Sequence, residues 1–551
     1  MSESVTALKE AVTGPALMRH VQEFARRVKL SGTPEELESF HYLKAQLDGF
    51  GYRTRLLMHD AYISLPGPAR VEAGGKALKA ITQSFSRPSP AGGLRGPLVD
   101  LGRGTAAEFE GRDVQGRVVL VEGIASPAVA ALASAAGAAG QLHISPQQHL
   151  HEMCISPVWG SPSDATLPDL PRTVVCTISQ EDGQALRARL AAGEALEAVL
   201  HSEVDTGWRQ TPLLEAELDG QGGAEAPFIL FSGHHDTWYE GVMDNGSANA
   251  TMLEAARVLA GRQGAWRRGL RLCFWSGHSH GRYSGSAWYA DTRWEELDRR
   301  CAAHVNVDST GGIGATVLTE TGVTPELVAL AADTIAAETG QHYKGKRPSR
   351  SSDQSFWGIG IPSMFGGLST QVPGTPTFGP PTMRNALGWW WHTPHDLIDK
   401  IDEGFLVRDT RVFVHALWRL LTEPVLPLDP SATAAALLQE LQGLPQEGPA
   451  APCLARAVAA AEALAAASTP SSDHAVMQAC RALVPLHMAE HDRFAHDPAL
   501  PLPAWPLLRP LKAWAQAPAG SDEARFLGVA AVRACNRLLH GLQRARAALD
   551  G

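Results

Sequence analysis

The chain has 551 residues, of which 44% are hydrophobic and 19% charged, and its formal net charge is −10 at pH 7. This length exceeds what one hydrophobic core can hold and predicts several domains. The composition excludes a disordered or fibrous protein, and the acidic balance argues against nucleic acid and anionic membranes as partners.

The N-terminal segment has no apolar core flanked by positive charge, and no stretch has the length of a membrane span. We therefore expect neither a signal peptide nor a membrane anchor. The seven cysteines are odd in number, scattered, and never spaced as Cys-x-x-Cys. That pattern is typical of a reduced, cytoplasmic protein and argues against a cysteine zinc site.

Apolar residues at helical spacing predict helices over 14–29 and 35–49, and alternating residues predict a strand over 52–65. A Gly/Pro-rich joint follows at 90–97. Beyond it, apolar runs predict a strand–strand–helix–strand series with a further strand and helix. This block ends near residue 205.

A second series begins with an apolar strand at 227–232 that runs into "GHHDT". Strands alternate with helices from there, at 247–261, 270–275, 303–309 and 324–340. This alternation predicts an α/β fold, with a mainly parallel sheet covered by helices on both faces. Such sheets bind ligands at the carboxyl ends of their strands.

After a linker at 421–433 the chain is rich in Ala and Leu and reads as helical to its end, over 433–442, 454–467, 474–490 and 522–548. No polar cluster recurs in these helices. We therefore expect a packing or dimerisation domain there.

Side chains that bind divalent metals occur in four segments, most of them just past predicted strand ends. Imidazole and carboxylate groups, three or four to an ion with one open position, are what a catalytic zinc needs. A carboxylate between two ions can also bridge them. The candidates are His234, His235 and Asp236, then Asp244, then Asp308, and last His392, His395 and Asp396.

Together these segments, with "SSDQSFWGIGIPSMF", resemble the co-catalytic zinc aminopeptidase and carboxypeptidase family that includes glutamate carboxypeptidase II. The resemblance is strongest over residues 227–402 and reaches most of the chain. It implies a zinc-peptidase-like fold with an inserted protease-associated domain, one or two zinc ions, and a homodimer through the C-terminal helices. The domains it implies are 1–92 (N-terminal part of the peptidase-like domain), 93–205 (protease-associated), 206–424 (peptidase-like) and 425–551 (dimerisation-like).

The resemblance also implies a role for each of five residues. His234 and Asp308 would bind the first zinc, His392 would bind the second, and Asp244 would bridge the two. Asp236 would orient His234, as carboxylates do for metal-bound imidazoles.

One loop departs from the family pattern, which has an adjacent Glu-Glu pair after a strand. In "FWSGHSHGRYSGS", His278 falls on the position of the general base and Ser279 on that of a zinc ligand. The spacing to the following Gly-Ser is one residue longer than usual, so His280 is a candidate for either role. Where the family often has an oxyanion-stabilising Tyr, this chain has Trp391, which can donate only an indole N–H.

Three functions are consistent with this loop. In the first, His278 or His280 replaces the lost carboxylates as base or ligand, and the protein is a metal-dependent hydrolase of a peptide-like or N-acyl amino acid amide bond. In the second, one zinc remains, as in the glutaminyl cyclases, which transfer an acyl group. In the third, catalysis is lost, as in the transferrin receptor. The retained ligand set favours the hydrolase.

Four tryptophans and four arginines bear on the substrate, a small peptide or acylated amino acid. An indole wall near the metals would favour an apolar or aromatic group, although core packing accounts for the tryptophans equally well. The arginines could bind a carboxylate, although each is also typical of a solvated surface. These residues are Trp238, Trp389, Trp390 and Trp391, and Arg282, Arg347, Arg350 and Arg384.

Overall fold

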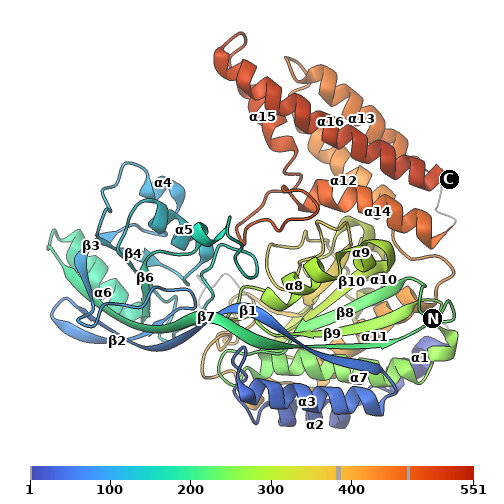
Figure 1. The fold of residues 1–551 in the computed structure, drawn as a ribbon, viewed down its shortest axis with the longest axis horizontal. Coiled ribbons are helices and arrows are strands. Elements are labelled where there is room, and N and C mark those ends of the chain that lie inside the picture. The colour runs from blue at the N-terminus through green and yellow to red at the C-terminus, as the bar shows by residue number, and fades with distance from the viewer. Residues whose placement is uncertain (1–2, 380–385, 468–471, 551) are drawn as a thin grey trace.

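The computed structural model describes residues 3–379, 386–467 and 472–550. Its centre is an 11-stranded sheet with the strand order β1-β2-β6-β5-β4-β3-β7-β9-β8-β10-β12 (Figure 1). The strands are β1 (Arg53–Ala73), β2 (Lys76–Thr82), β3 (Leu94–Asp100), β4 (Val118–Glu122), β5 (Gly140–Ile144), β6 (Val174–Ile178), β7 (Glu197–Leu218), β8 (Phe228–His234), β9 (Gly269–Trp275), β10 (Cys301–Asp308) and β12 (Ser363–Gly367). A separate two-stranded sheet pairs β11 (Ala315–Val317) with β13 (Thr370–Gln371).

The sheet contains two parallel blocks joined by antiparallel strands. Strands β9, β8, β10 and β12 are parallel neighbours, and so are β3, β4, β5 and β6. Between the blocks, β7 pairs antiparallel with both β3 and β9. The α/β fold expected from the sequence is confirmed, and the carboxyl ends of β8, β9 and β10 meet at one edge of their block.

Helices cover both faces of the β8–β12 block (Figure 1). The larger core lies under one face, where apolar side chains of the sheet pack against those of α2, α3, α7, α10 and α11. A smaller core lies on the other face, against α8 and α9. The bounds are α1 (Glu3–Glu10), α2 (Gly14–Phe24), α3 (Pro34–Gly49), α7 (Ala248–Ala260), α8 (Ser284–Thr292), α9 (Trp294–Arg300), α10 (Val328–Thr339) and α11 (Glu403–Thr422).

Two long strands connect this block to the inserted unit. β1 and β7 form one antiparallel ribbon, from the pair Arg53–Glu217 at one end to the pair Ala73–Ala198 at the other, with a single irregularity between Pro66 and Ala69. The second parallel block sits at the far end of the ribbon, with α4 (Ala106–Phe109), α5 (Pro127–Ala135) and α6 (Gln180–Ala191). The division of the chain at residues 93 and 205 stays a prediction, and position 205 falls within strand β7 of the ribbon.

The C-terminal part is helical, as expected. Its helices share one apolar core, and α14 also packs on the core of the central sheet through residues such as Val476 and Val484. The helices are α12 (Pro430–Gln442), α13 (Ala451–Ala465), α14 (Asp473–Met488), α15 (Leu508–Gln516) and α16 (Asp522–Asp550).

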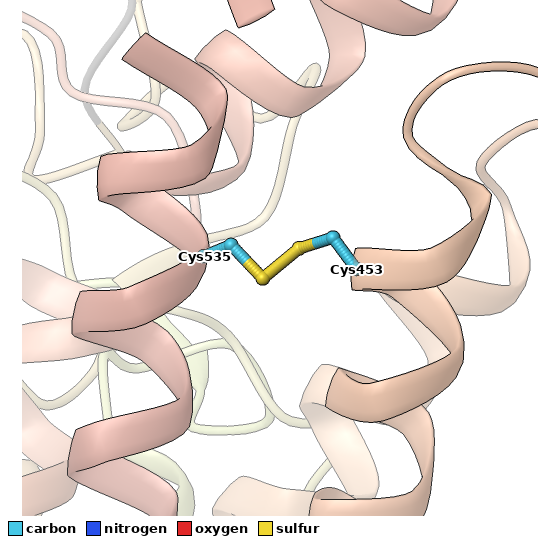
Figure 2. The surroundings of a disulfide bond; sticks show 2 residues. All are labelled: Cys453 and Cys535. Atoms are coloured by element: carbon cyan, nitrogen blue, oxygen red, sulfur yellow. A yellow bond between two sulfur atoms is a disulfide. The ribbon is translucent and has the colours of Figure 1, made fainter. Parts of the chain in front are cut away.

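A disulfide joins Cys453 on α13 to Cys535 on α16 (Figure 2). The sequence-based expectation of a wholly reduced set of cysteines is therefore wrong for this pair. Scattered cysteines distant in sequence gave no sign of the pairing, because it depends on two helices meeting in the fold. Among the described residues, no helix has the length and apolar character needed to cross a membrane.

Candidate metal centre

Three of the predicted ligands lie at the carboxyl edge of the β8–β10 block. His234 is the last residue of β8, Asp308 is the last residue of β10, and the loop with His278 follows β9, on the other side of β8 from β10. Ring nitrogens of His234 and His278 and a carboxylate oxygen of Asp308 lie within 4.8 Å of one another. The sheet topology thus brings together residues that are 74 positions apart in the chain.

Asp244 lies between two imidazoles. Its Oδ1 is 3.1 Å from Nε2 of His234 and its Oδ2 is 3.0 Å from Nε2 of His392. The carboxylate of Asp396 supports this arrangement, because it accepts hydrogen bonds from the backbone N–H groups of Met243 and Asp244. Asp244 therefore has the position of a bridging ligand.

The electrostatics of the centre favour a bound cation. Burial would raise the pKa of Asp244, but hydrogen bonds from His234 and His392 overcome it and hold that pKa below its usual range. Burial and the charge of Asp244 raise the pKa of Asp308. Burial lowers the pKa of His234, but the neighbouring carboxylates outweigh it and raise that pKa to about 10. Two carboxylates beside one imidazole, the buried Asp244 and the partly exposed Asp308, would be stabilised by a divalent metal.

The imidazoles of His234 and His392 present the same ring nitrogen, Nε2, to Asp244. Nδ1 of His234 lies 2.8 Å from the carbonyl oxygen of Asp236, and Nδ1 of His392 lies 2.7 Å from the carbonyl oxygen of Glu152. A carbonyl can only accept, so each ring carries a proton on Nδ1 and points Nε2, the nitrogen that could bind a metal, at Asp244. This donor set fits zinc, which binds neutral imidazole and carboxylate.

Asp236 differs from its expected arrangement. Its backbone carbonyl holds His234, whereas its carboxylate oxygen is 3.8 Å from the ring. The carboxylate instead accepts hydrogen bonds from Ser31 Oγ and from the backbone N–H groups of His278 and Ser279. The side chain of Asp236 therefore fixes the loop after β9.

That loop separates the two candidate histidines. The His278 ring stacks on His234 with ring centres 3.7 Å apart, and its Nδ1 is 2.9 Å from Oδ2 of Asp353. His280 is fully buried elsewhere, with Nδ1 3.0 Å from Ser31 Oγ and its ring against Trp238. His278 is thus the loop histidine that lies beside His234 and Asp308.

Ser279 stands where the resemblance places a zinc ligand. Its Oγ is buried and has no hydrogen-bond partner among the described residues. A serine hydroxyl is a much weaker zinc ligand than a carboxylate. The His392 side of the centre therefore has fewer strong ligands than the His234 side.

The tryptophans divide into two pairs. Trp238 and Trp390 are buried and belong to the core. Trp389 and Trp391 are partly exposed: Trp391 stacks on His392, with ring centres 3.4 Å apart, and Trp389 stacks on His149. Of the two buried rings, Trp238 also lies beside the centre, with its ring centre 5.4 Å from that of His392.

The predicted arginines have different surroundings. Arg347 donates to the backbone carbonyls of Leu502 and His487, and Arg350 donates to that of Asp497, so both fasten the C-terminal helical part. Arg282 stays partly exposed, close to the loop of His278. Arg384 lies outside the described residues.

Two of the remaining candidates face away from the cluster. His235 is buried between Phe24 and Phe40, with its Nε2 2.8 Å from Ser39 Oγ. His395 is exposed and contacts His149. Neither belongs to the His234, His278 and Asp308 group.

Sequence reasoning missed two residues that hold site histidines, Glu152 and Asp353. Glu152 comes from the inserted unit and Asp353 from the "SSDQSF" segment, far from their partners in the chain. The acid within "SSDQSF" was a usable signal, since that segment contributed to the family resemblance. Nothing in the sequence around Glu152 indicated that its backbone carbonyl contacts His392.

Comparison with known proteins agrees with this geometry. Residues 216–417 match the model of peptidase family M28. A probable lipoprotein aminopeptidase, LpqL, of Mycobacterium tuberculosis is 24% identical over 320 residues, which are 56% of this chain and 61% of that protein. Mouse aminopeptidase NAALADL1 is 31% identical over 93 residues, which are 16% of this chain and 12% of that protein. The alignments thus span less than two thirds of either relative.

Solved structures show the same fold. The M28 peptidase precursor of Shewanella amazonensis superposes with a TM-score of 0.61 at 17% identity, covering 77% of this chain and 97% of that one. BSAP, a zinc aminopeptidase from Bacillus subtilis, gives 0.56 at 20% identity, covering 75% of this chain and 96% of that one.

The fold and the His/Asp cluster define an α/β protein with a candidate metal centre at the carboxyl edge of its sheet. Residues 216–417 resemble peptidase family M28, in agreement with the family resemblance found in the sequence.

Proposed function

We propose that this protein is a zinc-dependent hydrolase that cleaves a peptide-like or N-acyl amino acid amide bond. The observation that carries the proposal is the position of Asp244, 3.1 Å and 3.0 Å from the Nε2 atoms of His234 and His392. Asp308 and His278 complete the cluster. When bound, zinc would polarise the scissile carbonyl and make a water more acidic.

The chain's own residues would then move the protons. His278 lies beside His234 and Asp308, and its Nε2 would accept a proton from the attacking water and pass it to the leaving amine. The partly exposed Trp391 would supply an indole N–H near the developing oxyanion. His280 has no such role in this proposal, because it packs against Trp238 away from the cluster.

We propose one tightly held ion, on the side of His234 and Asp308. On the other side, His392 and Asp244 would need a further strong ligand, and Ser279 offers only a hydroxyl. A second ion there would bind more weakly. Metal analysis after dialysis at graded zinc concentrations would show how many ions bind at each concentration.

The decisive experiment measures metal content and amide hydrolysis in the same preparation. The protein should retain zinc after gel filtration and release amine from amino acid amides or N-acyl amino acids. Absence of metal together with absence of hydrolysis after addition of zinc, cobalt or manganese would favour a binding protein instead. Loss of ammonia from an N-terminal glutamine, seen by product mass, would favour the cyclase.

The variant His278→Ala separates the two roles of this residue. If His278 is the general base, His278→Ala should retain zinc and lose turnover on the order of 10²–10⁴-fold. As a ligand, its removal would lower the zinc content as well. The matched control variant, His280→Ala, should keep both its zinc and its turnover.

We also propose a homodimer through the C-terminal helices. Phe526, Val529 and Val532 are 76%, 54% and 50% exposed, and they follow one another at helical spacing on α16. Sedimentation of the wild type and of Phe526→Glu would test this contact.

A cytoplasmic location stays a prediction. It is testable by cell fractionation combined with alkylation of free thiols. The Cys453–Cys535 bond would persist only in an oxidising compartment.

A further inference from the structure

A second loop supports the metal centre from the side of β12. In this loop, Ser352 Oγ lies 3.4 Å from Oδ2 of Asp308, and the next residue, Asp353, places Oδ2 2.9 Å from Nδ1 of His278. Asn306 donates a hydrogen bond of 2.7 Å to Ser352 Oγ. Two successive residues therefore reach two members of the cluster.

Asp353 is fully buried and both of its oxygens are engaged. Oδ2 faces His278, and Oδ1 accepts a hydrogen bond of 2.9 Å from Ser286 Oγ. An ionised carboxylate only accepts, so the proton of a neutral His278 is on Nδ1.

We propose that Asp353 is a positioning residue: its carboxylate holds His278 in the Nδ1-protonated tautomer, with Nε2 free to accept a proton beside His234 and Asp308. The proposal rests on the hydrolase function proposed above. A glutamate base has no tautomers and needs no such partner. The requirement for Asp353 thus arises because position 278 is a histidine.

The proton balance is simple. The water oxygen forms a bond to the carbonyl carbon while its proton goes to Nε2 of His278, which becomes an imidazolium. Asp353 stays ionised and stabilises that cation across the 2.9 Å contact. The proton then moves from Nε2 to the leaving nitrogen as the C–N bond breaks, and His278 returns to its neutral tautomer.

The first test is kinetic. Asp353→Asn should lower kcat on the order of 10²–10⁴-fold while KM and zinc content stay close to wild type, and Asp353→Glu should recover part of the loss. Asp497 is the matched control, because it is a buried aspartate paired with His491 in the C-terminal part. Asp497→Asn should leave kcat within about twofold. An equally small effect of Asp353→Asn would overturn the proposal.

The second test does not require an Asp353 variant to fold. Nitrogen NMR of the ¹⁵N-histidine-labelled wild type, free of metal and with zinc, reports which ring nitrogen carries the proton, and His278→Gln identifies the signal. We expect the proton on Nδ1 in both forms, and a proton on Nε2 would overturn the proposal. A wild type without zinc or turnover would instead overturn the hydrolase function, which the same samples reveal.

Discussion

Glu152 and His392 are joined by two hydrogen bonds. The backbone N–H of Glu152 donates to the carbonyl oxygen of His392 at 3.1 Å, and Nδ1 of His392 lies 2.7 Å from the carbonyl oxygen of Glu152. The inserted unit therefore sets the orientation of a candidate metal ligand in the central domain. Two nearby side chains extend this contact: Gln147 donates to the carbonyl of Trp389, and Nδ1 of His151 is 2.6 Å from that of Trp391.

The double change Gln147→Ala and His151→Ala should weaken zinc binding by about 10–100-fold, as expected when the partners that orient a ligand are lost. Competition with a chromophoric chelator measures this directly. The exposed neighbour provides the control, since Gln148→Ala should leave zinc affinity unchanged. Equal affinities in the double variant and the wild type would mean that the insert does not support the centre.

Asp244→Asn should weaken zinc binding by about 100-fold or more. This loss should exceed that of any single change outside the ligand set. The amide keeps the shape of the side chain but removes the charge between His234 and His392. Elemental analysis after dialysis gives the zinc content. Asp48→Asn, on the surface of α3, controls for the loss of one negative charge, and similar zinc contents in the two variants would contradict the bridging role.

Buried histidines should make the fold sensitive to acid. Burial lowers the pKa of His143 to about 4, whereas the unfolded chain has a histidine pKa of about 6.5. Below pH 6.5 the unfolded chain therefore gains a proton that folded His143 does not. The stability contributed by this difference is fully present above pH 6.5 and is lost as the pH falls to about 4, by at most about 3 kcal/mol.

Urea unfolding between pH 4 and 7 measures this loss. His143→Gln should flatten the dependence of the free energy of unfolding on pH, whereas His41→Gln, at an exposed position, should leave its slope unchanged. A slope in His143→Gln equal to that of the wild type would show that other groups determine the acid sensitivity.

Loss of the Cys453–Cys535 bond should destabilise the helical part by roughly 2–4 kcal/mol, since the bond closes a long loop, with a sequence separation of 82. Cys453→Ser should lower the unfolding midpoint to the same extent as reduction of the wild type, with zinc content unchanged. Thermal unfolding with and without reductant checks this. An identical midpoint in reduced and oxidised wild type would argue against the bond.

The sequence predicted the parts of the site that follow from strand order. His234 and Asp308 end apolar strands, and parallel strands bring their carboxyl ends to one edge, so this convergence could be foreseen. The contacts of Asp353 and Glu152 could not, because they depend on how loops from distant segments pack. Periodicity carries no information about such long-range contacts.

The long ribbon was missed for a different reason. Residues 52–65 alternate clearly and predicted a strand, but β1 continues to Ala73 through Pro66, Gly67 and Pro68, residues that usually end strands. The predicted block boundary near residue 205 falls inside β7, which has polar side chains along its middle. In both cases, pairing between two distant segments overrides the local signal.

The β1–β7 ribbon also limits how the protein can move. Both chain crossings into the insert belong to this ribbon, and its ladder is interrupted at one place, between Pro66 and Ala69. Proline has no N–H to donate, so the backbone resists bending least at that interruption. Any swing of the insert about the ribbon would therefore pivot there, and it would strain the two hydrogen bonds between Glu152 and His392.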